Sequence, residues 1–206
     1  MRKPVIITAA LLLVIIGYFL RPKKDIQDVN NSPPTVLDED ILEQASIQKC
    51  DGIPTPNQPA GPYFKTNSPN RNRIAEPSNP INRLVVEGVV YSQNCKPILG
   101  ALIDFWQAGE DGEYDNIGFN LRGHQFTDEK GEYSLETVIP AMYSSRPPHI
   151  HVKIQTSMDK PVFTSQLYFP ENSESTSDTL FNDKLVVNLE KTTKGKIGIF
   201  NFVIPN

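Results

Sequence analysis

From Arg83 to the end of the chain, short runs of β-branched or alternating apolar residues recur, and turn residues separate them. Such runs are typical of strands, because successive side chains of a strand point to opposite faces of a sheet. There are about eight of these runs and no convincing helical pattern: RLVVEGVVYS, ALIDFWQAG, HQFTD, EYSLETVIP, IHVKIQT, FTSQLYF, KLVVNLE and KGKIGIFNFVI. Many short strands without helices predict an all-β fold, an antiparallel β-sandwich.

The N-terminus differs in kind from the rest of the chain. Residues 4–20 read PVIITAALLLVIIGYFL, a run without a charge that basic residues flank on both sides. A membrane-spanning helix needs about 17–25 mostly apolar residues, whereas a signal peptide has a shorter apolar core followed by a small-residue cleavage site. We therefore predict an N-terminal membrane anchor, a transmembrane helix, within residues 1–24. A signal segment and a buried core helix are the alternative interpretations.

Two polar segments separate the apolar run from the first predicted strand. Residues 25–49 contain Pro-Pro and several charged side chains, which is typical of a linker. Residues 50–80 are rich in Pro and Asn, so they do not suit regular ladders, and we expect them to wrap the sheet surface. The predicted organisation is an anchor, a linker and one β-sandwich domain over residues 50–206.

The two cysteines indicate where the domain resides. Cys50 and Cys95 both follow the apolar run, and neither belongs to a CxxC motif. In an exported domain the two would form a disulfide, whereas in a cytoplasmic domain they would be two buried thiols. We favour the disulfide, and with it a membrane-anchored domain on the extracytoplasmic side.

The charge of the chain excludes one class of partner. The net charge is -4, and the body of the protein contains no basic run. Proteins that bind nucleic acid gather lysine and arginine against the phosphates, so we expect no nucleic-acid partner.

The stretch RPPHIHVKI, residues 146–154, places two histidines at the start of a predicted strand. His149 and His151 are two residues apart, so they share one face of the strand, and Ile150 takes the other face. The pair holds two of the three histidines in the chain. The two imidazoles are candidate metal ligands, or else two ordinary half-exposed side chains.

Two tyrosines are candidates to complete a metal site. Tyr143 lies just upstream of the histidines, and Tyr114 lies in the turn-like stretch EDGEYDN. A phenol titrates near pH 10, so only a strongly acidic metal keeps it ionised at neutral pH, and phenolate is a hard donor that suits Fe(III). Taken singly, Tyr114 is better explained as a surface turn residue, and Tyr143 is explained equally well as a sandwich-corner residue bonded to backbone.

The stretches that contain these tyrosines and histidines, together with their neighbours along the chain, resemble the intradiol ring-cleavage dioxygenases, the family of protocatechuate 3,4-dioxygenase and catechol 1,2-dioxygenase. The resemblance covers roughly residues 50–205. The stretches that carry it are PTPNQPAGPYF, VEGVVYSQNCKPILGALIDFWQAGEDGEYD, RGHQFTDEKGEYSLETVIPAMY, RPPHIHVKI and SQLYF. The RPxHIH motif with a tyrosine upstream at this spacing is the most specific of them.

The resemblance implies a non-haem Fe(III) cofactor held by four side chains. Tyr114 and His149 would be equatorial ligands, and Tyr143 and His151 would be axial. In the family, the axial tyrosine leaves the iron when a catechol binds, and its phenolate helps to take up the protons of the substrate; here that residue is Tyr143.

The resemblance also implies the reaction and two further catalytic residues. Arg146 would lie over the bound ring and stabilise the negative charge that builds up on it, and Gln166 would help to orient the oxygen-derived intermediate. The substrates would be a catechol-type compound and O2. The ring would open between the two hydroxyl-bearing carbons to give a muconate-type diacid.

Several neighbouring residues have other interpretations. Asp115 offers a carboxylate that would suit an Fe(II) site instead. His124 has no family role that we can assign, and we expect it to be exposed. We expect Trp106 and Phe105 to form core and wall rather than to take part in catalysis.

A different class of function also suits part of the chain. Residues 84–138 resemble non-catalytic prealbumin-like or carboxypeptidase-regulatory modules, which would make the domain an extracytoplasmic binding module. A degenerate homologue that binds iron or a catechol without turnover is a third hypothesis. Such modules have no need of the two tyrosines and the two histidines together.

Two departures from the family pattern limit what the resemblance implies. Residues 25–80 are too short and too rich in Pro for the helical dimerisation region of the cytosolic catechol enzymes, so the oligomeric state is open. Only Ser144 and Ser145 separate Tyr143 from Arg146, where well-known bacterial members carry a longer insertion. We therefore expect a more open pocket, and the identity of the catechol stays open.

Overall fold

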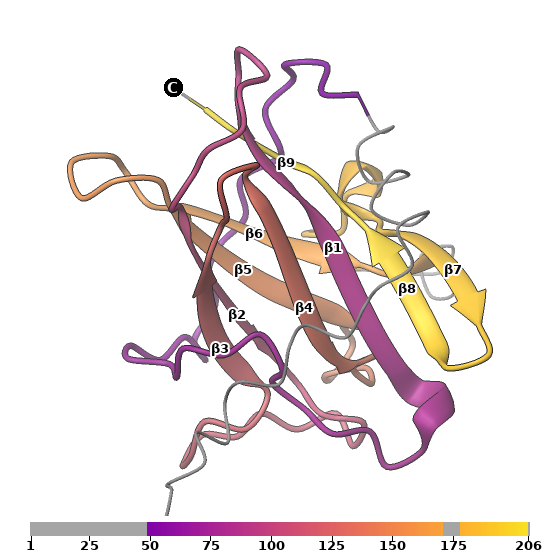
Figure 1. Ribbon diagram of the computed structural model, residues 1–206. Coiled ribbons are helices and arrows are strands. Elements are labelled where there is room, and N and C mark those ends of the chain that lie inside the picture. The colour runs from indigo at the N-terminus through magenta and orange to yellow at the C-terminus, as the bar shows by residue number, and fades with distance from the viewer. Residues whose placement is uncertain (1–48, 171–177, 206) are drawn as a thin grey trace, which may run out of the picture. The chain divides into compact units, whose positions relative to one another are not determined.

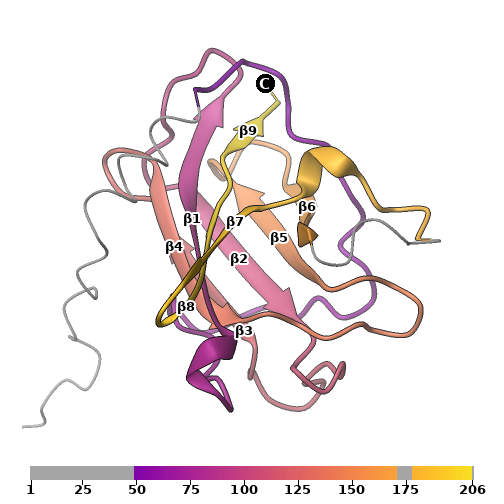
Figure 2. The same ribbon diagram turned by 90° about the vertical axis from the view of Figure 1, so that its right-hand side faces the viewer.

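The structure, a computed structural model, describes residues 49–170 and 178–205. Within these residues, nine strands form two facing sheets (Figures 1 and 2), as the sequence predicts for an all-β sandwich. One sheet has the order β4-β1-β8-β7, with β9 also paired to β1, and the other has the order β3-β2-β5-β6. The strands are β1 (Arg83–Ser92), β2 (Leu102–Gln107), β3 (Arg122–Phe126), β4 (Glu132–Val138), β5 (His149–Gln155), β6 (Phe163–Tyr168), β7 (Asn188–Thr192), β8 (Gly195–Ile199) and β9 (Phe202–Ile204).

Alternate side chains of both sheets fill the core between them. In β1 these are Leu84 and Val86, and in β5 they are Ile150, Val152 and Ile154, all fully buried. Each such side chain contributes about 1.5–3 kcal/mol relative to leaving it in water. Because the odd-numbered residues of β5 alternate with these, its histidines point to the opposite, outer face of the sheet.

A row of polar and aromatic side chains crosses that outer face. His151 of β5 pairs with Trp106 of β2 on one side and with Gln166 of β6 on the other, and Trp106 pairs in turn with Arg122 of β3. All four residues are at most 2% exposed. Because these side chains are buried on an outer face of the sheet, another part of the chain must cover them.

The cover is the segment of residues 55–71, here called the strap, which runs beside β6 and β5 (Figure 2). The backbone N–H of Gln58 donates to the carbonyl of Thr164 in β6 at 2.8 Å. Gly61 has φ +73°, and a Cβ there would lie 3.4 Å from Cε1 of His151, so the strap passes close to the imidazole. The predicted wrapping of the sheet by the Pro- and Asn-rich segment is confirmed.

The predicted antiparallel arrangement is wrong for the C-terminal strands. β8 and β9 both pair with β1 in parallel, whereas β4 pairs with β1 antiparallel. A parallel pair needs a long crossover connection rather than a hairpin. Nearly the whole domain lies between β1 and β8 in the sequence, which is long enough for such a crossover. The prediction failed because the alternation of side chains does not reveal the direction of a strand.

Two boundaries also differ from the prediction. A short 3-10 helix, η3 (Asp183–Leu185), takes up the start of the run KLVVNLE, and β7 begins only at Asn188. The final predicted run is split into β8 and β9, because the side chain of Asn201 interrupts the ladder and accepts the N–H of Val89 at 2.8 Å.

No helix within residues 49–170 and 178–205 is long and apolar enough to cross a membrane. The predicted anchor, residues 1–24, and the predicted linker apart from Lys49 lie outside the described residues. Both stay predictions.

The predicted disulfide is present. Cys50 and Cys95 are bonded, with their Cα atoms 5.5 Å apart. The bond joins the start of the described domain to the turn that follows β1.

We expect the double substitution Cys50→Ser, Cys95→Ser to lower the free energy of unfolding by about 3–4 kcal/mol, because the bond constrains the unfolded chain over a separation of 45 residues. Denaturant unfolding followed by tryptophan fluorescence measures this. Reductant should reproduce the loss in the native protein and leave the variant unchanged. Equal unfolding midpoints for all samples would contradict the expectation.

Asp104 of β2 is a buried carboxyl group beneath the strap. It is 7% exposed and accepts a hydrogen bond from the Ser68 hydroxyl at 2.9 Å. Burial raises the pKa of Asp104 from 3.8 to about 6, and the Ser68 hydrogen bond and the charges of His124 and Lys153 offset only part of the rise. The folded protein therefore binds this proton more tightly than the unfolded chain does.

From this shift we expect the protein to lose stability as the pH rises from about 4 to about 6, and the loss to persist at higher pH. Asp104→Asn should remove it while keeping an oxygen that accepts from Ser68. The melting temperature of the variant should exceed that of the native protein by a few degrees at neutral pH, and the two should meet near pH 4. A variant less stable at every pH would show that the carboxylate itself is needed.

Candidate active site

Three polar atoms from two parts of the chain converge at one end of the four-stranded sheet. The hydroxyl of Tyr114 lies 3.3 Å from Nε2 of His149 and 3.1 Å from Nε2 of His151, and the two Nε2 atoms are 3.2 Å apart. The histidines open β5, and Tyr114 lies between β2 and β3. All three side chains are buried. The structure thus brings together three of the four ligands that the sequence predicts.

Both histidines direct a ring nitrogen, Nε2, toward the Tyr114 hydroxyl, and both rings are neutral. Nδ1 of His149 lies 2.7 Å from the carbonyl oxygen of Pro147, and a carbonyl only accepts, so Nδ1 carries the proton and Nε2 a lone pair. Burial lowers the pKa of His149 to about 4 and holds the pKa of His151 well below its ordinary value. Both rings are therefore unprotonated at neutral pH, the state in which imidazole binds a metal.

The three atoms fit the ligands of a single metal ion. Imidazole nitrogens and protein oxygens lie about 2.0–2.2 Å from a bound metal such as zinc, so two ligands at right angles are about 3 Å apart. Burial raises the pKa of Tyr114, and the charges of Arg146 and Arg122 oppose the rise only in part. A cation held at this point would ionise the phenol. Among the described residues, no three His, Cys, Asp or Glu side chains form a metal site, so this site depends on tyrosine.

The fourth predicted ligand, Tyr143, lies at the edge of the cluster. Its ring packs edge-on against Tyr114 with the ring centroids 5.2 Å apart, and its hydroxyl hydrogen-bonds to the hydroxyl of Tyr63. That hydrogen bond raises the pKa of Tyr143. Tyr63 belongs to the strap and stacks on Tyr114 at 4.4 Å. Three tyrosines therefore line one side of the two imidazoles.

Arg146 and Gln166 lie on the other side of the histidines. The Arg146 guanidinium lies 3.0 Å from Nε2 of His149, and its Nη2 donates to Oε1 of Gln166 at 2.6 Å. Nε of Arg146 forms an ion pair with Asp178 at 2.9 Å. The amide nitrogen of Gln166 donates to the carbonyl of Pro59 in the strap at 3.2 Å. A fixed cation thus lies next to the point where the ligands converge.

Comparison with known proteins identifies the family. The family model described as "Dioxygenase" matches residues 60–146. The dioxygenase domain of a dioxygenase carbohydrate-binding protein fusion from Streptomyces sp. SirexAA-E has a solved structure that is 46% identical, with a TM-score of 0.70; the match covers 74% of this chain and 99% of that chain. An intradiol ring-cleavage dioxygenase of Aspergillus niger is 31% identical over 174 residues. This chain belongs to the intradiol dioxygenase family.

A third relative agrees with this assignment. The structure of an intradiol ring-cleavage dioxygenase from Tetranychus urticae is 27% identical, with a TM-score of 0.67, and the match covers 74% of this chain and 95% of that chain. The Aspergillus relative is a longer protein than this chain. The Aspergillus match covers 69% of this chain and 55% of the relative, so the chain spans about half the length of that intradiol dioxygenase.

Asp115, the alternative carboxylate ligand, is turned away from this intradiol site. Its carboxylate accepts the backbone N–H groups of Ile117, Gly118 and Asn120 at 2.7–3.0 Å. These hydrogen bonds hold the pKa of Asp115 below its ordinary value. The carboxylate folds the loop that follows Tyr114 and does not join the cluster, so an Fe(II) site built on it finds no support in the structure.

Of the neighbouring residues, the structure confirms two expectations and corrects one. Phe105 is fully buried in the core, and Trp106 forms a wall, with its ring stacked on His151 at 5.0 Å. The expectation that His124 is exposed is wrong. It is half-buried, because the strap lies over it, and its Nδ1 is 3.1 Å from the Ser68 hydroxyl.

Three residues of this site have no role that the sequence predicts. Tyr63 was part of a stretch that resembles the family, but only the folded strap shows that it reaches Tyr114. Tyr168 donates to Gln166 at 3.1 Å. The two residues are two positions apart on one strand, and this spacing could have indicated that their side chains share a face. Asp178 lies far along the chain from Arg146, and nothing in the sequence pattern connects them.

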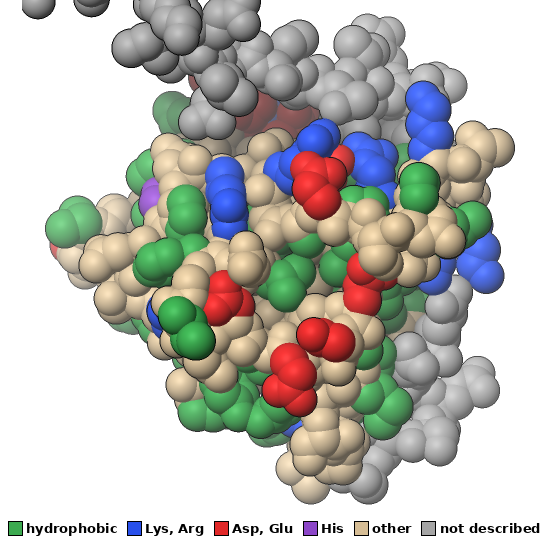
Figure 3. Space-filling model, turned by 90° about the horizontal axis from the view of Figure 1, so that it is seen from below, with side chains coloured by type: hydrophobic (Ala, Val, Ile, Leu, Met, Phe, Trp, Pro, Cys, Tyr) green, Lys and Arg blue, Asp and Glu red, His purple; other side chains and the backbone are tan. Residues whose placement is uncertain are grey.

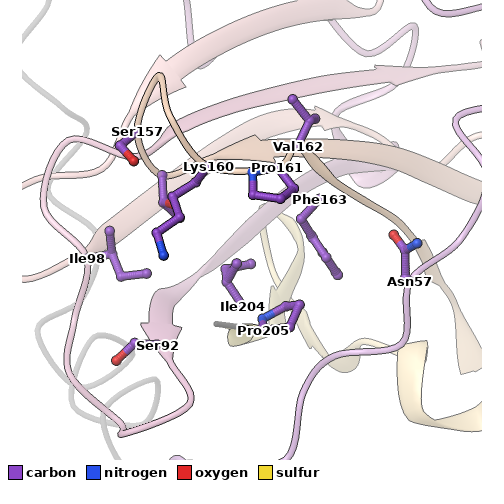
Figure 4. A pocket seen from close by; sticks show the side chains of 11 residues that line it. Asn57, Ser92, Ile98, Ser157, Lys160, Pro161, Val162, Phe163, Ile204 and Pro205 are labelled. Carbon is purple, nitrogen blue, oxygen red and sulfur yellow. The ribbon is translucent and has the colours of Figure 1, made fainter.

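The described residues form two cavities, one beside the ligand cluster and one away from it. One of about 690 Å³ is lined by Tyr114 together with acidic residues of the nearby loops, Glu76, Glu110, Asp111, Glu113 and Asp115; acidic side chains also gather on the face seen in Figure 3. The other, of about 450 Å³, lies at the opposite end of β5 and β6 and contains Lys160 and Phe163 (Figure 4). None of the predicted ligands lines this second cavity.

Proposed function

We propose that the protein is a non-haem Fe(III)-dependent intradiol dioxygenase. It cleaves a catechol-type ring with O2 between the hydroxyl-bearing carbons and gives a muconate-type diacid. The observation that carries this proposal is the convergence of one phenol oxygen and two imidazole Nε2 atoms within 3.3 Å of one another. A non-catalytic binding module has no use for that set.

Four side chains would hold the iron: Tyr114, Tyr143, His149 and His151. The bound ferric ion supplies Lewis acidity and a template that makes a chelated catecholate reactive toward O2. The Pro147 carbonyl keeps the proton of His149 on Nδ1, so that Nε2 carries the lone pair that would bind the iron. Trp106 and the strap cover His151 and keep water away from it.

Tyr143 is placed to take a proton from the substrate. Its phenolate oxygen would accept a catechol proton as the substrate binds, and the hydrogen bond to Tyr63 then holds the resulting phenol beside the site. The raised pKa of Tyr143 makes its oxygen the more basic proton acceptor.

Arg146 is placed to stabilise the negative charge of the bound ring. Its ion pair with Asp178 and its hydrogen bond to Gln166 fix the guanidinium before substrate arrives, so little reorganisation is needed during the reaction. Gln166, held by the strap through Pro59, orients the oxygen-bearing side of the substrate.

The domain acts outside the cytoplasm, anchored by the apolar segment within residues 1–24. The disulfide between Cys50 and Cys95 supports this location, because such bonds persist in oxidising compartments. An exported enzyme would act on aromatic compounds outside the cell.

The reaction is tested with catechol and ¹⁸O2. Iron-loaded protein should consume one O2 per catechol and give a ring-opened diacid that carries both labelled atoms, without added reductant. A product with one labelled atom, or one opened outside the diol, would contradict intradiol cleavage.

A further inference from the structure

Arg122 is a buried cation that the reaction described above does not use. It is the first residue of β3, only 1% exposed, and it lies in the row with Trp106 and His151 on the outer face of the sheet. Burying a guanidinium costs several kcal/mol unless its hydrogen bonds and charge are compensated. The partners of Arg122 therefore indicate what the burial achieves.

Those partners are backbone carbonyls rather than carboxylates. Nη1 of Arg122 donates to the carbonyl of Tyr63 at 2.5 Å, and Nε donates to the carbonyl of Asp115 at 3.1 Å. No carboxylate forms an ion pair with Arg122 anywhere in residues 49–170 and 178–205. Its Nη2 is buried and has no hydrogen-bond partner in the same residues.

The two carbonyls belong to the two segments that carry the stacked tyrosines. Tyr63 is in the strap, and Asp115 follows Tyr114 directly in the loop after β2. The planar fork of arginine reaches two acceptors at once, which a lysine ammonium does with less precision. The Arg122 side chain thus connects both the strap and the loop to β3. The same two segments carry the rings of Tyr63 and Tyr114, whose centroids are 4.4 Å apart.

A second arginine provides a natural comparison. Arg71 also donates to carbonyls of this region, those of Phe119 and Arg122, but it makes no contact with the backbone of Tyr63 or Asp115. Arg71 therefore ties the end of the strap to Phe119 of the loop and to the start of β3, away from residues 60–66.

We propose that Arg122 is a positioning residue that joins the Tyr63 segment to the Tyr114 segment and so sets where the phenol of Tyr114 stands relative to the imidazoles. Its positive charge interacts with the phenolate form of Tyr114 and with the carboxylates of Asp115 and Asp104. The proposal rests on the proposed iron site for its catalytic meaning, but the joining of the two segments can be measured without iron.

The first test is hydrogen–deuterium exchange of the metal-free protein. In Arg122→Met, amide exchange should rise roughly tenfold or more in both the strap around residues 60–66 and the loop of residues 115–121, because two charge-assisted hydrogen bonds are lost. Arg122→Lys should give an intermediate rise. Arg71→Met should raise exchange in the loop alone. Exchange in Arg122→Met that matches the native protein in both segments would overturn the proposal.

The second test is the visible spectrum of iron-loaded protein. Arg122→Met should shift the tyrosinate-to-Fe(III) band to longer wavelength, because a positive charge near the phenolate is removed, whereas Arg122→Lys should restore most of the native position and Arg71→Met should leave it unchanged. An unshifted band in Arg122→Met would overturn the role at Tyr114. If the native protein binds no iron, the proposed function fails, and the exchange experiment still decides whether Arg122 joins the two segments.

Discussion

Replacing His151 with alanine should abolish iron binding and activity. The Nε2 of His151 lies 3.1 Å from the Tyr114 hydroxyl and 3.2 Å from Nε2 of His149, so it forms one corner of the triangle of ligand atoms. Loss of an outer-shell partner of a ligand already costs about 10–100-fold in metal affinity, and loss of the ligand itself should cost more. Iron content after dialysis and the rate of O2 uptake with catechol measure the two effects.

His124→Ala is the matched control for this substitution. His124 is the only other histidine in the sequence, and it lies beneath the strap, where it contacts Ser68. The control protein should keep its iron and most of its activity. If His151→Ala retained iron as well as His124→Ala does, the histidine pair would not be the metal site.

Replacing Arg146 with methionine should lower kcat by about 10²–10³-fold, the usual cost of removing a group that stabilises charge in a transition state. The guanidinium is fixed by Asp178 and Gln166 and lies 3.0 Å from His149, next to the position that the substrate would take. Iron binding should survive, because Arg146 is not itself one of the four proposed ligands. Arg146→Lys keeps the charge but loses the fork, so its kcat should fall less.

Arg83→Met serves as the control for Arg146→Met. Its side chain is 23% exposed against 21% for Arg146, and it likewise forms an ion pair, with Glu136 at 2.8 Å, but on the other sheet. It should leave kcat unchanged. A loss of iron from Arg146→Met in step with its loss of activity would mean that the residue supports the metal site rather than the reaction.

Much of the fold could be predicted because strand alternation depends on local sequence. The apolar members of β5 face the core, and this alone places His149 and His151 together on the other face. The parallel pairing of β8 with β1 could not be predicted in this way. Alternation reports which side chains share a face and carries no information about the direction of the neighbouring strand.

The site was predictable where its residues are close in sequence or lie in a recognisable motif. The histidine motif and the tyrosines at positions 114 and 143 are of this kind. Tyr63 and Asp178 reach the site through contacts with residues far away in the sequence: Tyr63 contacts Tyr143, and Asp178 contacts Arg146. The role of Asp115 was ambiguous in the sequence. The three backbone N–H groups that donate to its carboxylate come close to it only when the loop has folded.

The most direct test of the iron site is the visible spectrum of the purified, iron-loaded protein, before and after catechol is added without oxygen. A tyrosinate-to-Fe(III) charge-transfer band that shifts when catechol binds is the predicted result, because Tyr114 would be a phenolate ligand and a catechol would enter the coordination sphere. Tyr114→Phe should weaken the band. A colourless protein that takes up no iron would contradict the account and would leave the same sandwich to be explained as a binding module.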